Sequence, residues 1–401
     1  MDSLTRNFAG DPKIVLCDVT ECTGCFACET ICPKKAISQC VSEEGFNYPV
    51  IDGEICISCH ACEKICPVLN RIEKNAQGDI YASWIRDVSI RKQSSSGGIF
   101  SALAISIIGD GGVVVGAKLC DDNYVRHVIV SDINGLGKIR GSKYVQSLIG
   151  RELIRNIKEH LDRGVKVLFC GTPCQVAGVR SALKNSPLLY TIDLVCHGVP
   201  SPVLFSRLLS DIRKKIPNVV SYNFRDTEKW LVCSNVNVNV NGHIVNRRLY
   251  GIFTFYQDAF LKGYLHRSCC YHCHYCSPQR IGDITLGDFW GVGKKIPFSG
   301  DVSSGCSLVS VNSPKGRILF DAIKAQIEYE HRELIESIEG GNRQLVEPSA
   351  YPKERHSFYK DAYALPYKKL IRKYRLEVIK RPSIIVSCIS KIHNCLMSHR
   401  R

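Results

Sequence analysis

The sequence predicts an α+β protein in which a small cysteine-rich domain precedes a larger mixed α/β body. Two closely similar cysteine motifs lie within residues 1–75 of the 401-residue chain. Further along, short valine-rich runs that end in glycine turns alternate with helical patterns, as in the strand–turn–helix units of α/β proteins. Hydrophobic residues make up 45% of the chain, which is enough to bury a sizeable core and excludes a disordered or collagen-like chain.

The composition also indicates in which cellular compartment the protein is expected. The chain has 22 cysteines, and a protein of this length does not need disulfides to be stable, so the many thiols indicate metal binding. The N-terminus lacks the basic and apolar segments of a secretion signal. The apolar runs Ile99–Ile108 and Ile384–Ile389 are shorter than the roughly 20 residues of a membrane span. We therefore expect a cytoplasmic protein with reduced thiols.

The cysteine motif of the N-terminal region occurs twice. The segment CTGCFACETICP at residues 22–33 recurs as CISCHACEKICP at residues 56–67. Two CxxC steps wrap three thiolates around one [4Fe–4S] cluster, and the cysteine before proline reaches the other cluster, as in bacterial ferredoxins with two clusters. Zinc usually takes two CxxC pairs, so this three-plus-one pattern favours iron and sulfide over a zinc site or a set of buried thiols.

The spacing assigns these eight cysteines to two [4Fe–4S] clusters of a ferredoxin-like domain, residues 1–75. The first set is Cys22, Cys25, Cys28 and Cys66, and the second set is Cys32, Cys56, Cys59 and Cys62. Since each cluster accepts a single electron, the domain is predicted to conduct electrons one at a time. The domain is acidic, whereas the whole chain has a formal charge of +15.

A turn rich in hydroxyls and glycines opens the body. Residues 93–98, with the sequence QSSSGG, precede the apolar helical run Ile99–Ile108, and Gly111 and Gly112 end that run before a short valine strand. Hydroxyls and glycines at a helix start are ordinary N-caps, but the backbone N–H groups and dipole at such a turn also hold phosphates. The residues alone leave both interpretations open.

Two further buried strands each deliver a cysteine at their ends. Val165–Cys170 precedes the turn that contains Cys174, and Tyr190–Val195 leads into Cys196 and His197. The carboxyl ends of neighbouring strands are where α/β folds bind ligands. We therefore expect Cys174 and Cys196 to lie close together.

Residues 234–245 predict an antiparallel hairpin. Valines and asparagines alternate there before the Asn241–Gly242 turn, so one face is expected to be buried and the asparagine row to face solvent. A cysteine-rich segment and the strand Asp283–Gly287 follow.

That segment holds four cysteines within eight residues, which is the density of a metal site. They are Cys269, Cys270, Cys273 and Cys276. Alone they fit a zinc site made from their own thiols or a histidine, whereas two of them joined to Cys174 and Cys196 fit a third [4Fe–4S] site. The residues leave the choice open.

The C-terminal region, residues 351–401, is strongly basic and partly helical in pattern. Leu370, Ile371, Tyr374 and Val378 have the spacing of one helical face among lysines and arginines. The pattern is typical of a solvated helix docked on the body, or of a basic segment that lies on an anionic membrane surface. Nucleic acid is not an expected partner, because no binding module accompanies the charge.

The segments QSSSGG, GSKYVQS, GTPCQVAG, DLVCHGVPSP and DITLGDFWG together resemble the beta subunit of coenzyme F420 hydrogenase/dehydrogenase, fused here to an N-terminal ferredoxin domain. The resemblance covers about residues 15–300 and divides the body into an N-terminal region, 76–165, and a C-terminal region, 166–350. Members are iron–sulfur flavoproteins in which FAD lies between a cluster and the substrate. The resemblance therefore implies a mixed α/β flavin-binding body.

The resemblance also implies site residues by matching position. A third [4Fe–4S] cluster is implied on Cys174, Cys196, Cys270 and Cys273. Cys269 and Cys276 depart from the usual pattern, and either one could displace a ligand.

The flavin-contacting loops are implied in the same way. Their residues are Ser95, Ser96, Gly97, Gly98, Lys143, Gln146 and Ser147. A positive charge on Lys143 beside the flavin would stabilise the reduced ring, or Lys143 is a surface residue. His197 is a candidate proton donor or a turn residue.

The sequence thus predicts an iron–sulfur flavoprotein oxidoreductase. It would pass electrons between a one-electron carrier such as ferredoxin and an organic hydride donor or acceptor, either F420-like or of another kind, through [4Fe–4S] clusters and FAD. One alternative is a non-catalytic electron-carrier subunit of a larger complex, docked through its acidic domain. Another is a reductase in polysaccharide biosynthesis with peripheral contact at the inner face of the membrane through the basic region.

Overall fold

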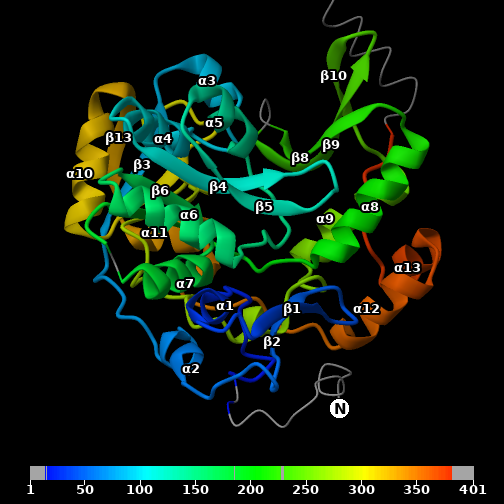
Figure 1. Ribbon diagram of the computed structural model, residues 1–401. Helices are drawn as coiled ribbons and strands as arrows, with labels where there is room; N and C mark the ends of the chain where they lie inside the picture. Colours follow the sequence, from blue (N-terminus) through cyan, green and yellow to red (C-terminus); the bar gives the residue numbers. More distant parts are fainter. Residues whose placement is uncertain (1–13, 15, 185, 227–229, 382–401) are drawn as a thin grey trace, which may run out of the picture.

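The structure is a computed structural model that describes residue 14 and residues 16–184, 186–226 and 230–381. It has an N-terminal head formed by the described residues up to 75, a central sheet with helices on both faces, and a second lobe (Figure 1). The predicted apolar run Ile384–Ile389 lies outside the described residues. No helix among the described residues has the length and apolar character needed to cross a bilayer.

The head contains two short helices and a hairpin. Each helix begins behind a residue in the left-handed conformation, Phe26 (φ 55°) or His60 (φ 59°), one position after the second cysteine of its motif. The hairpin strands pair antiparallel, and their isoleucines pack against Cys28 and Cys62. The elements are α1 (Ala27–Ile31), β1 (Ile37–Val41), β2 (Asn47–Ile51) and α2 (Ala61–Ile65).

Eight strands form the central sheet in the order β13-β3-β12-β11-β7-β6-β4-β5. The four strands β11, β7, β6 and β4 run parallel, and antiparallel strands flank them on either side. The predicted regions 76–165 and 166–350 both contribute strands to this one sheet. The strands are β3 (Asp79–Ile85), β4 (Val113–Leu119), β5 (Val125–Val130), β6 (Val167–Gly171), β7 (Leu189–Leu194), β11 (Ile284–Asp288), β12 (Ser307–Val311) and β13 (Ile327–Arg332).

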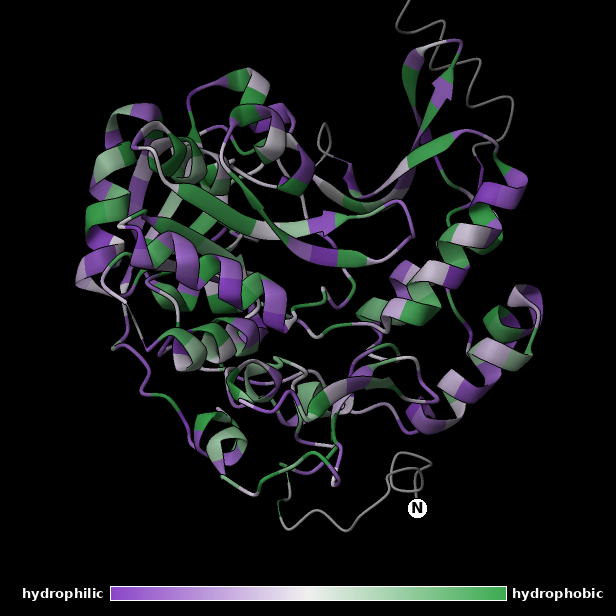
Figure 2. Cartoon of the chain, viewed as in Figure 1, coloured by the Kyte–Doolittle hydropathy of each residue, from purple (hydrophilic) through white to green (hydrophobic). Residues whose placement is uncertain are grey.

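Helices cover both faces of the sheet, because successive strand residues point to opposite sides. On one side Val114 packs with α4, α5 and α10, and on the other Val113 and Val115 pack with α6 and α7. Figure 2 shows hydrophobic residues concentrated in these strands. The helices around the sheet are α3 (Val88–Lys92), α4 (Ile99–Gly109), α5 (Ile133–Ile139), α6 (Arg151–Asp162), α7 (Pro173–Leu183), α10 (Pro314–Ile323) and α11 (Leu334–Gly340).

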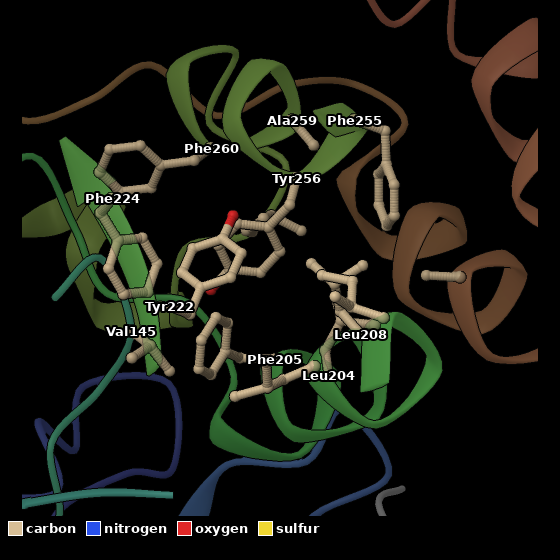
Figure 3. Close-up of a cluster of buried hydrophobic side chains, with 14 of the residues drawn as sticks. Val145, Leu204, Phe205, Leu208, Tyr222, Phe224, Phe255, Tyr256, Ala259 and Phe260 are labelled. Carbon is tan, nitrogen blue, oxygen red and sulfur yellow. The ribbon is translucent and has the colours of Figure 1, made fainter. Parts of the chain in front are cut away.

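The second lobe has an aromatic core (Figure 3). Phe205, Tyr222, Phe224 and Tyr256 meet there, and the ring centroids of Tyr222 and Phe224 are 4.7 Å apart. The lobe contains a three-stranded sheet in the order β10-β9-β8. Its elements are α8 (Pro202–Lys215), β8 (Val219–Asp226), β9 (Leu231–Val240), β10 (His243–Arg248) and α9 (Phe255–Leu261).

The predicted hairpin is confirmed as β9 and β10, but its asparagine row does not simply face solvent. Asn235 is buried, and the Asn237 side chain exchanges hydrogen bonds with Asn223, Ser221 and Asn246. The row has polar partners because polar residues of the neighbouring strands β8 and β10 lie opposite its asparagines.

The basic region folds back on the second lobe as α12 (Arg355–Ala364) and α13 (Tyr367–Lys373). Leu370 and Tyr374 are buried in the aromatic core, and Ile371 and Val378 pack against it. Of the two predicted alternatives, the structure shows the helix docked on the body. Within the described part of this region, the apolar face of α13 packs against the protein's own core.

Candidate functional site

The second set of head cysteines surrounds a small cavity. Cys32, Cys56, Cys59 and Cys62 all line this space of about 20 Å³, together with residues of β1, β2 and α2. Cys59 is exposed at its outer edge. The four residues that the spacing assigned to one cluster are thus brought together around one space.

The first set of head cysteines faces the body. The pKa of Cys25 is raised to about 11, first by burial and also by the neighbouring Cys22 and Cys66. Burial raises the pKa of Cys28 as well, and the same neighbours add to the effect. Cys66 comes from the second motif, so the structure reproduces the predicted exchange of the fourth cysteine. Cys17, which the sequence did not single out, lies beside Cys22 and Cys66.

A third group of cysteines lines a cavity of about 70 Å³ between the head and the body. Cys174 is in the first turn of α7, and Cys196 follows the end of β7. The remaining cysteines come from the 3-10 helix η3 (Ser268–His272) and the turn after it. The cysteines on this cavity are Cys174, Cys196, Cys269, Cys270, Cys273 and Cys276. The predicted meeting of Cys174 and Cys196 is therefore confirmed.

The two cysteines that depart from the family pattern lie beside predicted ligands. A hydrogen bond from Cys269 lowers the pKa of Cys270, and one from Cys276 lowers the pKa of Cys273 to about 7. Among the described residues no three Cys, His, Asp or Glu side chains converge as ligands of a single metal ion. Cys269 and Cys276 line the same cavity as the four predicted ligands.

A buried ion pair holds the cysteine-rich segment against the sheet. Arg280 donates to Asp193 on β7 at 3.0 Å, and both side chains are almost completely buried. Arg280 also donates to the backbone oxygens of Tyr275 (3.0 Å) and Leu194 (3.1 Å). One side chain therefore ties the segment that carries Cys273 to the strand that leads to Cys196.

The third group and the first head set are direct neighbours. A Cβ placed on Gly178 of α7 would lie 2.9 Å from the Cys25 sulfur, so only glycine allows this approach. Cys174 lies one helical turn before Gly178 on the same helix face. Tyr275 lines the cavity of the third group together with Cys174.

Two buried donors near these cysteines indicate that the sites suit iron–sulfur clusters. Thr23 Oγ1 and Arg267 Nη2 have no hydrogen-bond partner within the described residues. Both lie beside the first head set, next to Cys25 and Cys22 respectively. Cluster sulfides and thiolates accept hydrogen bonds from such donors, so the residues present fit [4Fe–4S] groups.

A large cavity opens at the carboxyl ends of the parallel strands and has a volume of about 270 Å³. Ser95, Ser96 and Gly98 line it where α4 begins. Gly98 is the N-cap of α4 and has φ +84°. The start of an 11-residue helix beside a cavity suits a phosphate, so the residues fit the diphosphate of a flavin dinucleotide.

Not every predicted flavin residue reaches this cavity. Lys143 and Ser147 line it, whereas Gly97 and Gln146 do not. A Cβ on Gly97 would lie 2.3 Å from the Ser83 backbone oxygen, so this glycine serves close packing of α4 against β3. Gln146 points the other way, toward Arg267.

The ammonium group of Lys143 donates hydrogen bonds to backbone carbonyls. Its Nζ donates to the carbonyl oxygens of Ile139 (3.0 Å), Arg140 (2.7 Å) and Gly141 (2.9 Å) at the end of α5. Burial lowers its pKa to about 7. Lys143 is therefore a half-buried residue of the cavity wall whose ammonium is bound by backbone carbonyls, and not a surface lysine.

His127 on β5 is a cavity residue that the sequence analysis missed. Its Nε2 is 2.9 Å from the Cys170 backbone oxygen, and its Nδ1 is 2.8 Å from Ser147 Oγ. Burial lowers its pKa to about 4, so the ring is neutral and donates from Nε2 to the carbonyl. No local motif marks His127, because its partners lie on other strands.

The far end of the large cavity carries a polar cluster around Asp288. Its carboxylate accepts hydrogen bonds from Arg225 (2.8 Å) and from Trp230 Nε1 (2.8 Å). Trp290 also lines the cavity, and its ring stacks on Trp230 with centroids 4.7 Å apart. The sequence contained Asp288 and Trp290 in the DITLGDFWG segment but carried no signal that Arg225 would join them.

One short segment separates the large cavity from the third cysteine group. Cys196, His197, Gly198 and Val199 line both spaces. Burial lowers the pKa of His197, and the neighbouring Asp288 opposes this effect. His197 therefore lies at the wall of the cavity near the polar cluster.

The fold and the cysteine sites define an iron–sulfur oxidoreductase with an electron-transfer role. A family model described as 4Fe-4S dicluster domain matches residues 21–70. A second family model, which describes the C terminus of the coenzyme F420 hydrogenase/dehydrogenase beta subunit, matches residues 164–337. These matches confirm the resemblance over two parts of the chain: residues 21–70 are similar to a 4Fe-4S dicluster domain, and residues 164–337 are similar to the C terminus of the coenzyme F420 hydrogenase/dehydrogenase beta subunit.

A solved structure similar to this chain belongs to the F420-reducing [NiFe] hydrogenase complex from Methanosarcina barkeri. The two chains are 19% identical, and the match covers 68% of this chain and 90% of that chain with a TM-score of 0.45. No curated protein matches the chain.

Proposed function

We propose that the chain is an iron–sulfur flavoprotein oxidoreductase that passes electrons between a one-electron carrier and an organic hydride donor or acceptor. The observation that carries the proposal is the segment Cys196–Val199, which lines both the third cysteine cavity and the large cavity. A flavin in the large cavity would lie directly behind a cluster ligand. This is the arrangement needed to join one-electron and two-electron chemistry.

The residues that would hold these groups belong to four sites. The two head sets would each hold one [4Fe–4S] cluster, and Cys174, Cys196, Cys270 and Cys273 would hold a third. FAD would place its diphosphate at the start of α4, beside Ser95 and Ser96. When bound, the clusters supply one-electron transfer and the flavin supplies hydride transfer.

The residues of the large cavity would position the substrate and handle its proton. Trp290 offers an aromatic face beside the Asp288 carboxylate, which Arg225 holds in place. His197 lies on the same wall; burial lowers its pKa, and the neighbouring Asp288 offsets only part of this effect. We therefore assign to the His197 ring the proton that accompanies hydride transfer.

The second head set would be the contact point for an external carrier such as ferredoxin. Cys59 is exposed, and Ile31, Ile55 and Ile57 beside neighbouring ligands are 39%, 47% and 55% exposed. An apolar rim around an exposed ligand brings a partner protein close to the cluster without strong binding. The small-molecule partner, F420-like or of another kind, would bind at the opposite end of the chain of sites.

Anaerobic reconstitution with metal and flavin analysis tests this proposal. Three clusters correspond to about twelve irons per chain, and the head alone to about eight. We expect about twelve irons together with flavin released on denaturation. A spectral screen with reduced F420, NADH and reduced ferredoxin as donors should then show turnover with at least one of them.

The same experiment separates the alternatives. About eight irons, no flavin and no turnover would indicate a non-catalytic carrier subunit. Zinc in place of iron would exclude the whole scheme. A role at the membrane would require liposome binding that is lost when residues 351–401 are removed.

A further inference from the structure

Arg267 is a completely buried arginine at the contact between head and body. It is 0% exposed and lies two residues before Cys269. Its Nε donates to the Cys22 backbone oxygen at 2.7 Å, and its Nη1 donates to the Asn47 backbone oxygen at 3.0 Å and to Gln146 Oε1 at 3.1 Å. A residue of the body thus reaches into the loop that carries the first head set.

The oxygen atoms that accept hydrogen bonds from the Arg267 guanidinium are all neutral. They are two carbonyls and one amide, and the guanidinium carbon lies 3.9 Å from the centre of the Tyr48 ring. Its Nη2 has no partner in the described part of the chain. An isolated buried charge is very unfavourable, so a counter-charge is needed close by. The groups whose charge Arg267 feels include Cys22, Cys269 and Cys270.

A second buried arginine at the same contact has its charge balanced in the usual way, by an ion pair with a carboxylate. Arg355 of the body is 2% exposed and forms a two-point ion pair with Glu44 of the head. Its charge is cancelled by that carboxylate. The two arginines join the same parts of the protein, but only Arg267 faces cysteines instead of a carboxylate.

We propose that Arg267 is the counter-charge shared by the first head set and the third cysteine group, and that it favours the reduced state of the iron–sulfur groups held there. The inference rests on the proposed function in one respect, namely that clusters occupy these cysteines. Arg267 is a positioning residue, since it acts on the electron through charge and hydrogen bonds to the ligand loop.

The physical basis is the change of charge on reduction. One electron taken from an external carrier leaves that carrier oxidised by one electron and adds one negative charge among Cys22, Cys25, Cys28 and Cys66. A fixed positive charge in a buried, weakly screened position stabilises that extra negative charge. Removal of the positive charge should therefore lower the reduction potential.

The test compares reduction potentials of anaerobically reconstituted full-length chains by spectroscopic redox titration. We expect Arg267→Gln to make reduction of a head cluster at least tenfold less favourable, which is a fall of about 59 mV for one electron. Arg267→Lys keeps the charge and should retain most of the wild-type potential. Arg355→Gln is the matched control, because it removes a buried arginine at the same contact but not one that faces cysteines.

A second variant covers the case in which Arg267→Gln does not load iron. Gln146→Glu keeps the acceptor for Arg267 Nη1 and places a carboxylate beside it, so the guanidinium stays in position with its charge cancelled. The potential should fall in this variant as well. Unchanged potentials in an iron-loaded Arg267→Gln chain, or in Gln146→Glu when the first variant fails, would overturn the proposal. An equal fall in Arg355→Gln would also overturn it.

These readouts do not depend on substrate or flavin. The head clusters are followed by their own spectra, so a chain without FAD or with only about eight irons still gives the potentials. Such a chain would contradict the proposed function and leave the role of Arg267 measurable. The reverse result, full iron and flavin with unchanged potentials, would contradict only the role of Arg267.

Discussion

The head and the body both gather cysteines at buried sites, but by different means. In the head, each motif supplies three cysteines of one set within seven residues, and two short helices and a hairpin are enough to arrange them. In the body, the predicted ligands come from three separate segments, at the start of α7, after β7 and around η3. The comparison teaches that the spacing of cysteines along the chain specifies the head sites. The body site instead depends on buried contacts between residues that are not themselves ligands.

The ion pair between Arg280 and Asp193 offers the strongest test of this difference. Arg280→Met leaves a buried carboxylate without its partner and should lower the free energy of unfolding by about 3 to 5 kcal/mol. The body site should lose its iron while the head keeps about eight irons per chain. Urea unfolding and iron analysis measure both effects. Lys166→Met, which breaks an exposed pair with Asp110, is the control and should change stability by less than about 0.5 kcal/mol.

A substitution where α7 contacts the head should have the next largest effect on stability. Gly178→Ala places a methyl group 2.6 Å from Cys25 Cβ and should destabilise the protein by about 2 kcal/mol through overpacking. Gly109→Ala on α4, where nothing lies within 4 Å, should instead stabilise by about 0.5 to 1 kcal/mol. Thermal unfolding of the two variants would show opposite signs. The same sign for both would mean that head and body do not meet as described.

A pH experiment sharpens the comparison, because the body buries a neutral histidine whereas His60 of the head is exposed. The pKa of His127 is about 4 in the folded chain, below the value near 6.5 expected after unfolding. The unfolded state therefore binds more protons between these values, and stability falls as the pH is lowered through this window. His127→Gln should reduce the loss of stability between pH 7.5 and 5.5 by about 1 kcal/mol.

Denaturant unfolding at the two pH values measures this difference. A His127→Gln chain that loses as much stability as the wild type would show that the histidine is not held neutral.

The smallest expected effect concerns a thiol that is near a site but outside its motif. Cys17 lies beside Cys22 and Cys66, yet the motif already supplies four cysteines to that set. Cys17→Ser should therefore leave the iron content at its wild-type value, whereas Cys66→Ser should lower it. Iron and sulfide analysis of the two variants decides this. A loss of iron in Cys17→Ser would mean that motif spacing alone does not define the head site.

Much of this arrangement was predictable, because the relevant signals are local. The doubled motif identified both head sets, and the strand ends at Cys174 and Cys196 predicted their meeting. The position of the basic region could be stated only as two alternatives, since the same apolar face of Leu370 and Tyr374 fits a protein core or a membrane. Only the folded structure shows which surface covers that face.

The residues that sequence reasoning missed depend on long-range contacts. His127 has its partners on other strands, and Arg225 meets Asp288 across 63 positions of the chain. Arg267 lies next to the cysteine-rich segment, but its role depends on the hydrogen bond to Cys22 across the contact between head and body. Gln146 was assigned to the flavin loops by resemblance, yet in the structure it binds Arg267.

The contact between Cys25 and Gly178 also has a consequence for the rate of electron transfer. A carrier domain on a flexible tether must search for its docking position before each transfer, so its throughput falls as solvent viscosity rises. Here the helix that carries Cys174 packs directly on the loop that carries Cys25. The head is therefore packed against the body and does not need to dock before each transfer. Under the proposed function, the diffusive search would be limited to the arrival of the external carrier at Cys59.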